Sequence, residues 1–169
     1  CSGQTFCFAD TWGGAYYVWD GFDLRNSTQQ LGVFLSGPGA HHLWVINGIY
    51  HYSGLANLGY AGFYVTAPNF IFSNNEIYNS DSAAVLVIGG HDTILEFNSV
   101  HNNGRNGDDE GAMKCAGNMY NCVMRYNTVW NNYRAGSSTV TCFAPGNCVG
   151  MSGLYFDFVS VDQAPGGSF

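Results

Sequence analysis

Residues 95–102 read LEFNSVHN, and four other segments of the chain carry the same pattern. They are residues 19–26 (WDGFDLRN), 44–51 (WVINGIYH), 72–79 (FSNNEIYN) and 124–131 (MRYNTVWN). One column of this repeat is apolar and consists of Leu24, Ile49, Ile77, Val100 and Val129. The intervals along it are 25, 28, 23 and 29 residues, and such uneven spacing is typical of a solenoid whose coils bulge outward on one side.

Asparagine dominates two further columns of the repeat. Two positions after the apolar residue the chain has Asn26, His51, Asn79, Asn102 and Asn131, and we interpret His51 as a substitute for asparagine. Two positions before it, four segments have Asn47, Asn75, Asn98 and Asn127. Asparagine tolerates the left-handed backbone of tight turns, and a buried asparagine can bond to the same residue in the coils above and below. The columns therefore predict asparagine ladders at the turns of stacked coils.

A second short strand follows a small residue in each coil. These strands are residues 32–35 (GVFL), 62–65 (GFYV), 84–87 (AVLV), 111–114 (GAMK) and 153–156 (GLYF). The runs are short and are separated by glycine, asparagine and serine, which favours strands over helices. One coil cannot bury its own apolar face, whereas stacked coils bury a continuous core. The sequence therefore predicts an all-β, single-domain parallel β-helix of about five to six coils.

Coils of the form N-x-[ILV]-x-N, followed by strands led by a small residue, resemble the right-handed parallel β-helix repeats of the pectate-lyase-like superfamily. The resemblance covers residues 17–160, which leaves residues 1–16 as an N-terminal lead-in segment and 161–169 as a C-terminal tail. That superfamily consists mainly of secreted lyases, hydrolases and epimerases of polysaccharides, and also includes viral tailspikes and adhesins. The resemblance therefore predicts the fold more sharply than the activity.

The composition argues against several classes of protein. The 169 residues fit one domain, 46% are hydrophobic, only 10% are charged, and the net charge is −7. Nucleic-acid binding needs clustered Lys and Arg, and the chain has five of them in all. No apolar run approaches the roughly 20 residues that span a membrane. We therefore expect neither a nucleic-acid partner nor a membrane partner.

The cysteines point to an oxidising compartment. There is no zinc-type CxxC, and the six cysteines form three close pairs whose connectivity stays open: Cys1 and Cys7, Cys115 and Cys122, Cys142 and Cys148. Asn26 begins an Asn-Ser-Thr sequon and is a glycosylation candidate in a host that glycosylates. The chain begins at Cys1 without a signal peptide, so we expect a mature or trimmed product of a secreted, extracellular protein.

The outward positions of the second strand are where a ligand could bind. We expect its inward positions to be Val33, Leu35, Phe63, Val65, Val85, Val87, Leu154 and Phe156. In the fourth of these strands, a one-residue shift buries Met113 and Cys115 and turns Lys114 outward, because burying an unpaired charge is costly. The outward column then holds Phe34, Tyr64, Leu86, Lys114 and Tyr155, with Asp157 at its lower end. Its flat rings either cover the apolar faces of sugars or cover a neighbouring loop or subunit.

Three adjacent carboxylates, Asp108, Asp109 and Glu110, precede Lys114 in a glycine-flanked segment. Carboxylate oxygens suit calcium, and a pair of carboxyl groups could also act as acid and base in glycoside hydrolysis. The alternative interpretation is a solvated acidic turn. If the segment is catalytic, Tyr155 and Asp157 on the next coil would complete the site.

The segments EGAMK (110–114) and GNMYNCVMRYNTV (117–129) resemble β-helix alginate and chondroitin lyases. The resemblance implies that Glu110 is a calcium ligand, that Lys114 is the catalytic base, and that Arg134 stands where those lyases have a substrate-binding arginine. Phe34 and Tyr64 would add sugar contacts. Tyr155 or Tyr126 would be the general acid that assists the leaving oxygen.

The leading hypothesis is a polysaccharide lyase or glycoside hydrolase. The second is a non-enzymatic, structural or adhesive β-helix that stacks end to end into an extracellular filament, favoured by the short chain, the sparse charge and the lack of a polar helical cap. A fragment of a larger enzyme is a third possibility. Under each of these hypotheses, we expect Glu96 and Arg125 to form a surface ion pair that contributes under about 1 kcal/mol to the stability of the fold.

Overall fold

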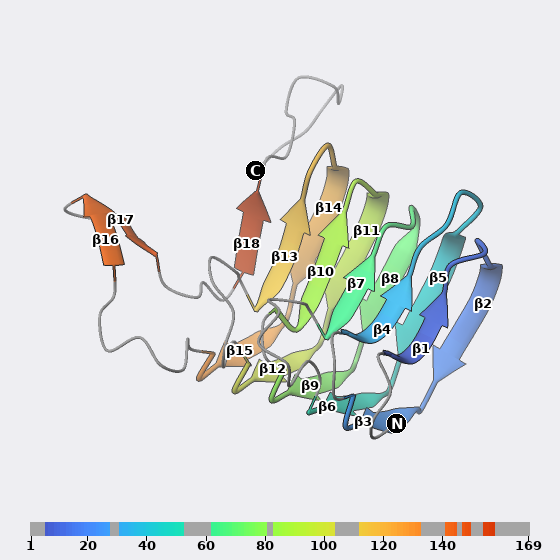
Figure 1. Ribbon diagram of the computed structural model, residues 1–169, viewed down its shortest axis with the longest axis horizontal. Helices are drawn as coiled ribbons and strands as arrows, with labels where there is room; N and C mark the ends of the chain where they lie inside the picture. Colours follow the sequence, from blue (N-terminus) through green and yellow to red (C-terminus); the bar gives the residue numbers. More distant parts are fainter. Residues whose placement is uncertain are drawn as a thin grey trace.

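A computed structural model describes residues 6–27, 31–52, 62–80, 83–103, 112–132, 141–144, 147–149 and 154–157. Every regular element in these ranges is a β-strand, and the strands wind into stacked coils of similar size (Figure 1). Within the same ranges no helix is long and apolar enough to cross a membrane. The predicted all-β solenoid is therefore confirmed.

Each coil contributes one strand to each of three sheets. The strands are β1 (Phe6–Asp10), β2 (Ala15–Asp20) and β3 (Asp23–Arg25) in the first coil; β4 (Leu31–Leu35), β5 (His41–Ile46) and β6 (Ile49–His51) in the second; β7 (Phe63–Val65), β8 (Phe70–Ser73) and β9 (Glu76–Tyr78) in the third; β10 (Val85–Ile88), β11 (His91–Glu96) and β12 (Ser99–His101) in the fourth; and β13 (Met113–Ala116), β14 (Tyr120–Arg125) and β15 (Thr128–Trp130) in the fifth. A sixth coil begins with β18 (Leu154–Asp157), after an antiparallel hairpin of β16 (Thr141–Ala144) and β17 (Asn147–Val149).

The three sheets are parallel and follow the coil order. Among the described residues, sheet A has the order β1-β4-β7-β10-β13-β18, sheet B has β14-β11-β8-β5-β2, and sheet C has β15-β12-β9-β6-β3. Strand β1 lies within the expected lead-in segment, residues 1–16, and pairs with β4. The strand count of each sheet agrees with the predicted five to six coils.

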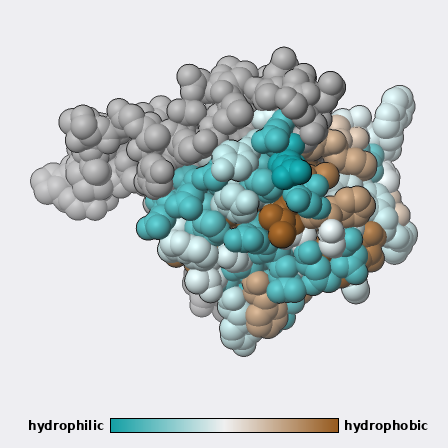
Figure 2. All heavy atoms as spheres, turned by 90° about the horizontal axis from the view of Figure 1, so that it is seen from below, coloured by the Kyte–Doolittle hydropathy of each residue, from teal (hydrophilic) through white to brown (hydrophobic). Residues whose placement is uncertain are grey.

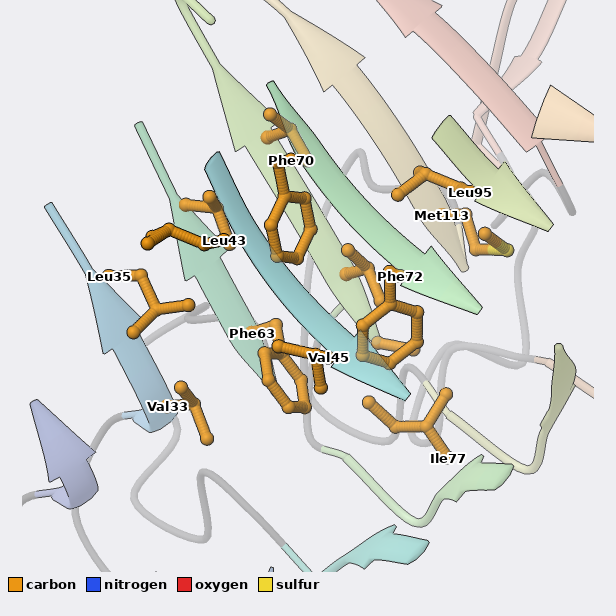
Figure 3. Close-up of a cluster of buried hydrophobic side chains, with 14 of the residues drawn as sticks. Val33, Leu35, Leu43, Val45, Phe63, Phe70, Phe72, Ile77, Leu95 and Met113 are labelled. Atoms are coloured by element: carbon orange, nitrogen blue, oxygen red, sulfur yellow. The ribbon is translucent and has the colours of Figure 1, made fainter. Parts of the chain in front are cut away.

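The core fills the interior of the coils. Phe63 of sheet A and Phe72 of sheet B are fully buried and their ring centroids lie 4.9 Å apart, and Figure 3 shows such side chains pointing into one interior. Six of the inward positions expected for sheet A have side chains that the structure describes. Each of them is at most 1% exposed: Val33, Leu35, Phe63, Val65, Val85 and Val87. The side chains of Leu154 and Phe156 lie outside the described part of the structure. Alternation along each strand therefore decides which side chains are buried.

An asparagine ladder joins the coils at the corner between sheets B and C. The side-chain oxygen of Asn98 accepts a hydrogen bond from the backbone N–H of Asn75 at 2.9 Å, and its amide donates to the carbonyl of Phe72 at 2.9 Å. Asn127 repeats both bonds one coil later, to the Asn98 N–H and the Leu95 carbonyl. Asn98 also donates to the Asn127 side chain at 3.0 Å. The predicted ladder of buried asparagines is therefore confirmed for these coils.

One coil was aligned wrongly from the sequence. Leu24 pairs with Tyr50, not with Ile49, and Tyr50 is 4% exposed whereas Ile49 is 41% exposed. The segment WVINGIYH allows both alignments, and the observed one buries the larger ring, whose centroid lies 4.6 Å from that of Phe63.

The same shift moves two other positions of that coil. Tyr52, not His51, takes the left-handed place occupied elsewhere by Asn26, Asn79, Asn102 and Asn131. The interpretation of His51 as a substitute for asparagine is therefore wrong. Asn47 is not in the buried ladder either, because Gly48 occupies that place and donates its N–H to Asn75. Asn47 instead belongs to a left-handed outer column with Asn74.

A second ladder lies at the far end of sheet C and was not predicted. The side-chain oxygen of Asn103 accepts the backbone N–H of Ser80 at 2.9 Å, and Asn132 does the same for the N–H of Asn103 at 3.0 Å. Ser80 and Asn103 are fully buried. This ladder fixes each coil where the chain leaves sheet C.

Candidate functional site

The longest connections of the solenoid lie between sheet C and sheet A. Sheets B and C are joined by two-residue turns, whereas the chain runs from His51 to Phe63, from His101 to Met113 and from Trp130 to Leu154 before it re-enters sheet A. Sheet A is therefore the sheet whose strands begin beside the long connections. The acidic segment predicted to bind calcium, residues 108–110, belongs to one of these connections.

Lys114 faces outward from sheet A, as the one-residue shift predicted. Met113 and Cys115 on either side of it are 0% exposed, and Lys114 is partly exposed. In the register of sheet A, Lys114 lies between Leu86 of β10 and Tyr155 of β18. The expected outward column therefore exists, since Tyr64 and Phe34 continue it on β7 and β4.

The outward column of sheet A is not an open strip of apolar side chains. Leu86 is only 8% exposed and packs in a cluster with Ala83 and Ala116, against which Tyr64 and Ile88 lie. Leu86 therefore follows the predicted alternative in which the outward column is covered rather than open to a sugar. Its side chain leaves the coil interior but is covered on the outside as well.

Several predicted site residues lie outside the described residues. These are Asp108, Asp109, Glu110 and Arg134, and also the side chains of Phe34, Tyr155 and Asp157, for which only the strand positions are given. The register places Asp157 beside Ala116, two residues along the strand from Tyr155. Among the described residues, no group of three or more His, Cys, Asp or Glu could hold a metal ion. The catalytic and calcium-binding roles of these residues stay predictions.

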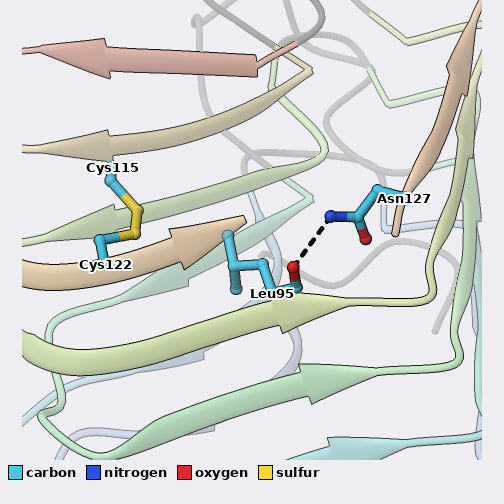
Figure 4. Close-up of a disulfide and its surroundings, with 4 residues drawn as sticks. All are labelled: Leu95, Cys115, Cys122 and Asn127. Carbon is cyan, nitrogen blue, oxygen red and sulfur yellow. Dashed lines mark hydrogen bonds between the residues drawn. A yellow bond between two sulfur atoms is a disulfide. The ribbon is translucent and has the colours of Figure 1, made fainter. Parts of the chain in front are cut away.

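A disulfide fixes the strand that carries Lys114. Cys115, the residue after it, is bonded to Cys122, so that β13 of sheet A is tied to β14 of sheet B (Figure 4). This pairing was one of the candidates in the sequence. Cys7 is disulfide-bonded as well, and Cys142 lies opposite Cys148 in the β16–β17 hairpin. Cys1, which forms a close pair with Cys7 in the sequence, lies outside the described residues.

Sheet C carries histidine–carboxylate pairs that sequence reasoning missed. Nε2 of His51 lies 3.3 Å from a carboxylate oxygen of Asp23, and Nε2 of His101 lies 3.1 Å from one of Glu76. Such a pair could orient a general base. However, the two histidine side chains are only 10% and 13% exposed.

The reason for this low exposure is a stack of rings along sheet C. His51, Tyr78, His101 and Trp130 occupy one column of the register, and their neighbouring ring centroids are 4.7, 5.1 and 4.2 Å apart with nearly parallel planes. Burial raises the pKa of Tyr78, and the carboxylate of Glu76 raises it further. Because each inner ring covers the faces of its neighbours, we interpret this column as structural.

The expected ion pair between Glu96 and Arg125 is present. Nε of Arg125 lies 2.7 Å from a carboxylate oxygen of Glu96. Both residues belong to sheet B, whereas Lys114 belongs to sheet A. Arg125 therefore stabilises the stacking of two coils and is not part of the outward column of Lys114.

The comparison with known families agrees with this architecture. The family described as the right-handed β-helix region matches residues 21–150. The chain belongs to this family. No curated protein and no solved structure matches the chain. The family match supports the right-handed β-helix and shows no specific similarity to lyases.

Within this β-helix, the geometry limits what the candidate site can do. Lys114 offers one cation on the outer face of sheet A, at the start of the coil that follows the acidic segment 108–110. A lysine ammonium on the outer face of a sheet can pair with the carboxylate of an acidic sugar.

Proposed function

We propose that the chain is a secreted carbohydrate-active protein, a polysaccharide lyase or a glycoside hydrolase. Its site would lie where the connections from sheet C enter sheet A. The observation that carries the proposal is the register of β13, which turns Lys114 outward. In the sequence, Asp108, Asp109 and Glu110 directly precede this strand, and Lys114 is the only Lys or Arg in the described strands of sheet A.

The lyase form of the proposal assigns each group a task. Lys114 removes the proton at C5 of a uronate, and Tyr155 donates a proton to the leaving oxygen. Calcium held by Asp108, Asp109 and Glu110 would supply positive charge beside the uronate carboxylate, and carboxylate oxygens are the ligands that this ion prefers. Arg134 would bind the substrate's carboxylate.

The hydrolase form uses the carboxylates directly. One of the three carboxyl groups, or Asp157 on β18, would protonate the glycosidic oxygen, and a second would activate water or attack the sugar. Lys114 would then bind substrate. The two forms differ in product, because only a lyase leaves an unsaturated uronate.

The test is a turnover screen on uronate-containing and neutral polysaccharides, with calcium and with a chelator. Reducing ends and the ultraviolet absorbance of unsaturated uronates are both followed. Calcium-dependent absorbance that is lost in Lys114→Met would support the lyase, and reducing ends without absorbance would support the hydrolase. The matched control is Arg125→Met, which removes the same charge from sheet B. No turnover on any substrate, with filaments visible by electron microscopy, would replace the proposal with the structural β-helix.

A further inference from the structure

An unbroken apolar column runs along the outer face of sheet B. The register places one residue from every coil in it: Val18, Trp44, Ile71, Ile94 and Val123. Val18 is 52% exposed, Trp44 is 45% exposed and Val123 is 37% exposed. An apolar column that faces solvent in every coil is unusual for a protein surface and points to a binding face.

The equivalent outer column of sheet C has a different character. It consists of Asp23, Ile49, Glu76, Ser99 and Thr128, four of which are polar or charged. The side of the molecule seen from below in Figure 2, where sheet C lies in Figure 1, is mainly hydrophilic with small hydrophobic patches. The other outer column of sheet C is the ring stack of His51, Tyr78, His101 and Trp130, so neither column of sheet C is aliphatic in every coil.

Polar columns flank the apolar column on both sides. On one side, Asp92 accepts hydrogen bonds from Asn121 and His91, which lower the pKa of Asp92 and keep it ionised at neutral pH. On the other side lie Asp20, Ile46, Ser73 and the Glu96–Arg125 pair, of which only Ile46 is apolar. The face therefore presents an apolar stripe that widens at Ile46, with hydrogen-bonding groups along both edges.

We propose that sheet B binds a neutral polysaccharide whose chain lies along the solenoid axis. A sugar ring has an apolar face of C–H groups and a rim of hydroxyl groups, which matches an apolar stripe with polar edges. Parallel strands are about 4.8 Å apart, so the five strands repeat this pattern over about 19 Å. A surface that repeats along one direction suits a linear polymer better than a small ligand.

The charges of this face exclude two other kinds of partner. Asp20, Asp92 and Glu96 contribute three negative charges against the one positive charge of Arg125, and the whole chain carries −7. An anionic polysaccharide would therefore be repelled. A protein partner requires a broad interface core that is depleted of charge, whereas this stripe is narrow and has charged side chains along both edges.

This binding face does not depend on the proposed catalytic site. It lies on sheet B, whereas Lys114 faces outward from sheet A. Loss of turnover in Lys114→Met would leave retention on neutral polysaccharides unchanged. Failure of one proposal is therefore distinguishable from failure of the other.

The test is affinity electrophoresis in gels that contain a soluble neutral polysaccharide, such as xyloglucan or galactomannan, or a polyuronate, together with depletion onto cellulose and chitin. The double variant Trp44→Thr/Ile94→Thr removes the centre of the stripe. The control Ile49→Thr/Trp130→Thr removes the same residue types from the outer face of sheet C, where Ile49 and Trp130 are each 41% exposed. Thermal unfolding of each variant checks that it is folded.

We expect the unmodified chain to be retained by at least one neutral polysaccharide and not by polyuronate. The sheet B variant should bind at least about tenfold more weakly, which corresponds to about 1.4 kcal/mol, and the control should stay within about twofold. Four results would overturn the proposal: no retention by any neutral polysaccharide, equal weakening in the control, stronger retention by polyuronate, or a dimer in sedimentation that the sheet B variant abolishes. The last result would assign the face to a second copy of the chain.

Discussion

Replacing Asn98 by alanine tests whether the asparagine ladder holds neighbouring coils together. Asn98 is 2% exposed, and its side chain serves the backbone N–H of Asn75 and the carbonyl of Phe72 in the preceding coil. Alanine removes both bonds and leaves the two backbone groups without these partners. The side chains of Asn75 and Asn127 keep other bonds, because Asn75 still donates to Val45 and Asn127 still accepts from the N–H of residue 98.

The expected cost follows from the two backbone groups. Each buried polar group left without a partner destabilises a protein by about 1–3 kcal/mol, so we expect Asn98→Ala to lose about 2–6 kcal/mol. With a guanidinium m value of about 4 kcal/mol/M, a loss of about 3 kcal/mol lowers the unfolding midpoint by about 0.7 M. Circular dichroism and tryptophan fluorescence should report the same midpoint if the coils unfold together.

The control is Asn131→Gly, in the exposed left-handed column. Asn131 has a φ of 49°, a conformation that glycine adopts without strain, so its unfolding free energy should change by less than about 0.5 kcal/mol. A loss below about 1 kcal/mol in Asn98→Ala, or one no larger than that of the control, would refute the argument that the ladder supplies essential backbone hydrogen bonds.

Three further predictions concern single features. Cys115→Ala/Cys122→Ala should lower the free energy of unfolding by about 2–3 kcal/mol in guanidinium titrations, because the disulfide closes a loop with a sequence separation of 7, and an unchanged midpoint would contradict this. Burial raises the pKa of Asp10, but hydrogen bonds from a tyrosine hydroxyl and backbone N–H groups outweigh burial and lower the pKa below its usual value of 3.8. Its stabilising contribution is therefore present above about pH 4 and is lost as the pH falls through the lowered pKa, so Asp10→Asn should flatten the acid side of the Tm–pH profile, and an unaltered profile would count against it. Arg125→Met breaks the exposed pair with Glu96 and should cost under about 1 kcal/mol by thermal unfolding, whereas a loss above about 2 kcal/mol would show a larger structural role.

The outward position of Lys114 was predicted correctly from the sequence, whereas the roles of the acidic segment stay predictions. The cost of burying a charge decided the position of Lys114, because the register that turns Lys114 outward also buries Met113 and Cys115. The same argument could not reveal that Leu86 is covered on its outer side. The exposure of an outward side chain depends on segments that are distant along the chain. The sequence of a single strand does not show where those segments pack.

The position of His51 was not predicted correctly from the repeat. In the alignment read from the sequence, His51 stood in an asparagine column, one place away from the column of Tyr78 and His101 that it joins. The alignment of this coil depended on whether Ile49 or Tyr50 is buried. Either side chain is apolar enough for the apolar column of the repeat. The ring stack and the pairing of His51 with Asp23 followed only from the correct register.

Alternation, turn residues and the cost of burying a charge were enough to predict the solenoid, the asparagine ladder between sheets B and C, and the outward position of Lys114. Packing between coils was needed to establish that Tyr50 fills the core, that rings stack along sheet C, and that one apolar column runs along sheet B: Val18, Trp44, Ile71, Ile94 and Val123. When coils are joined by connections of unequal length, their sequences do not show which residues pair, because that register is set when side chains of neighbouring coils pack against one another.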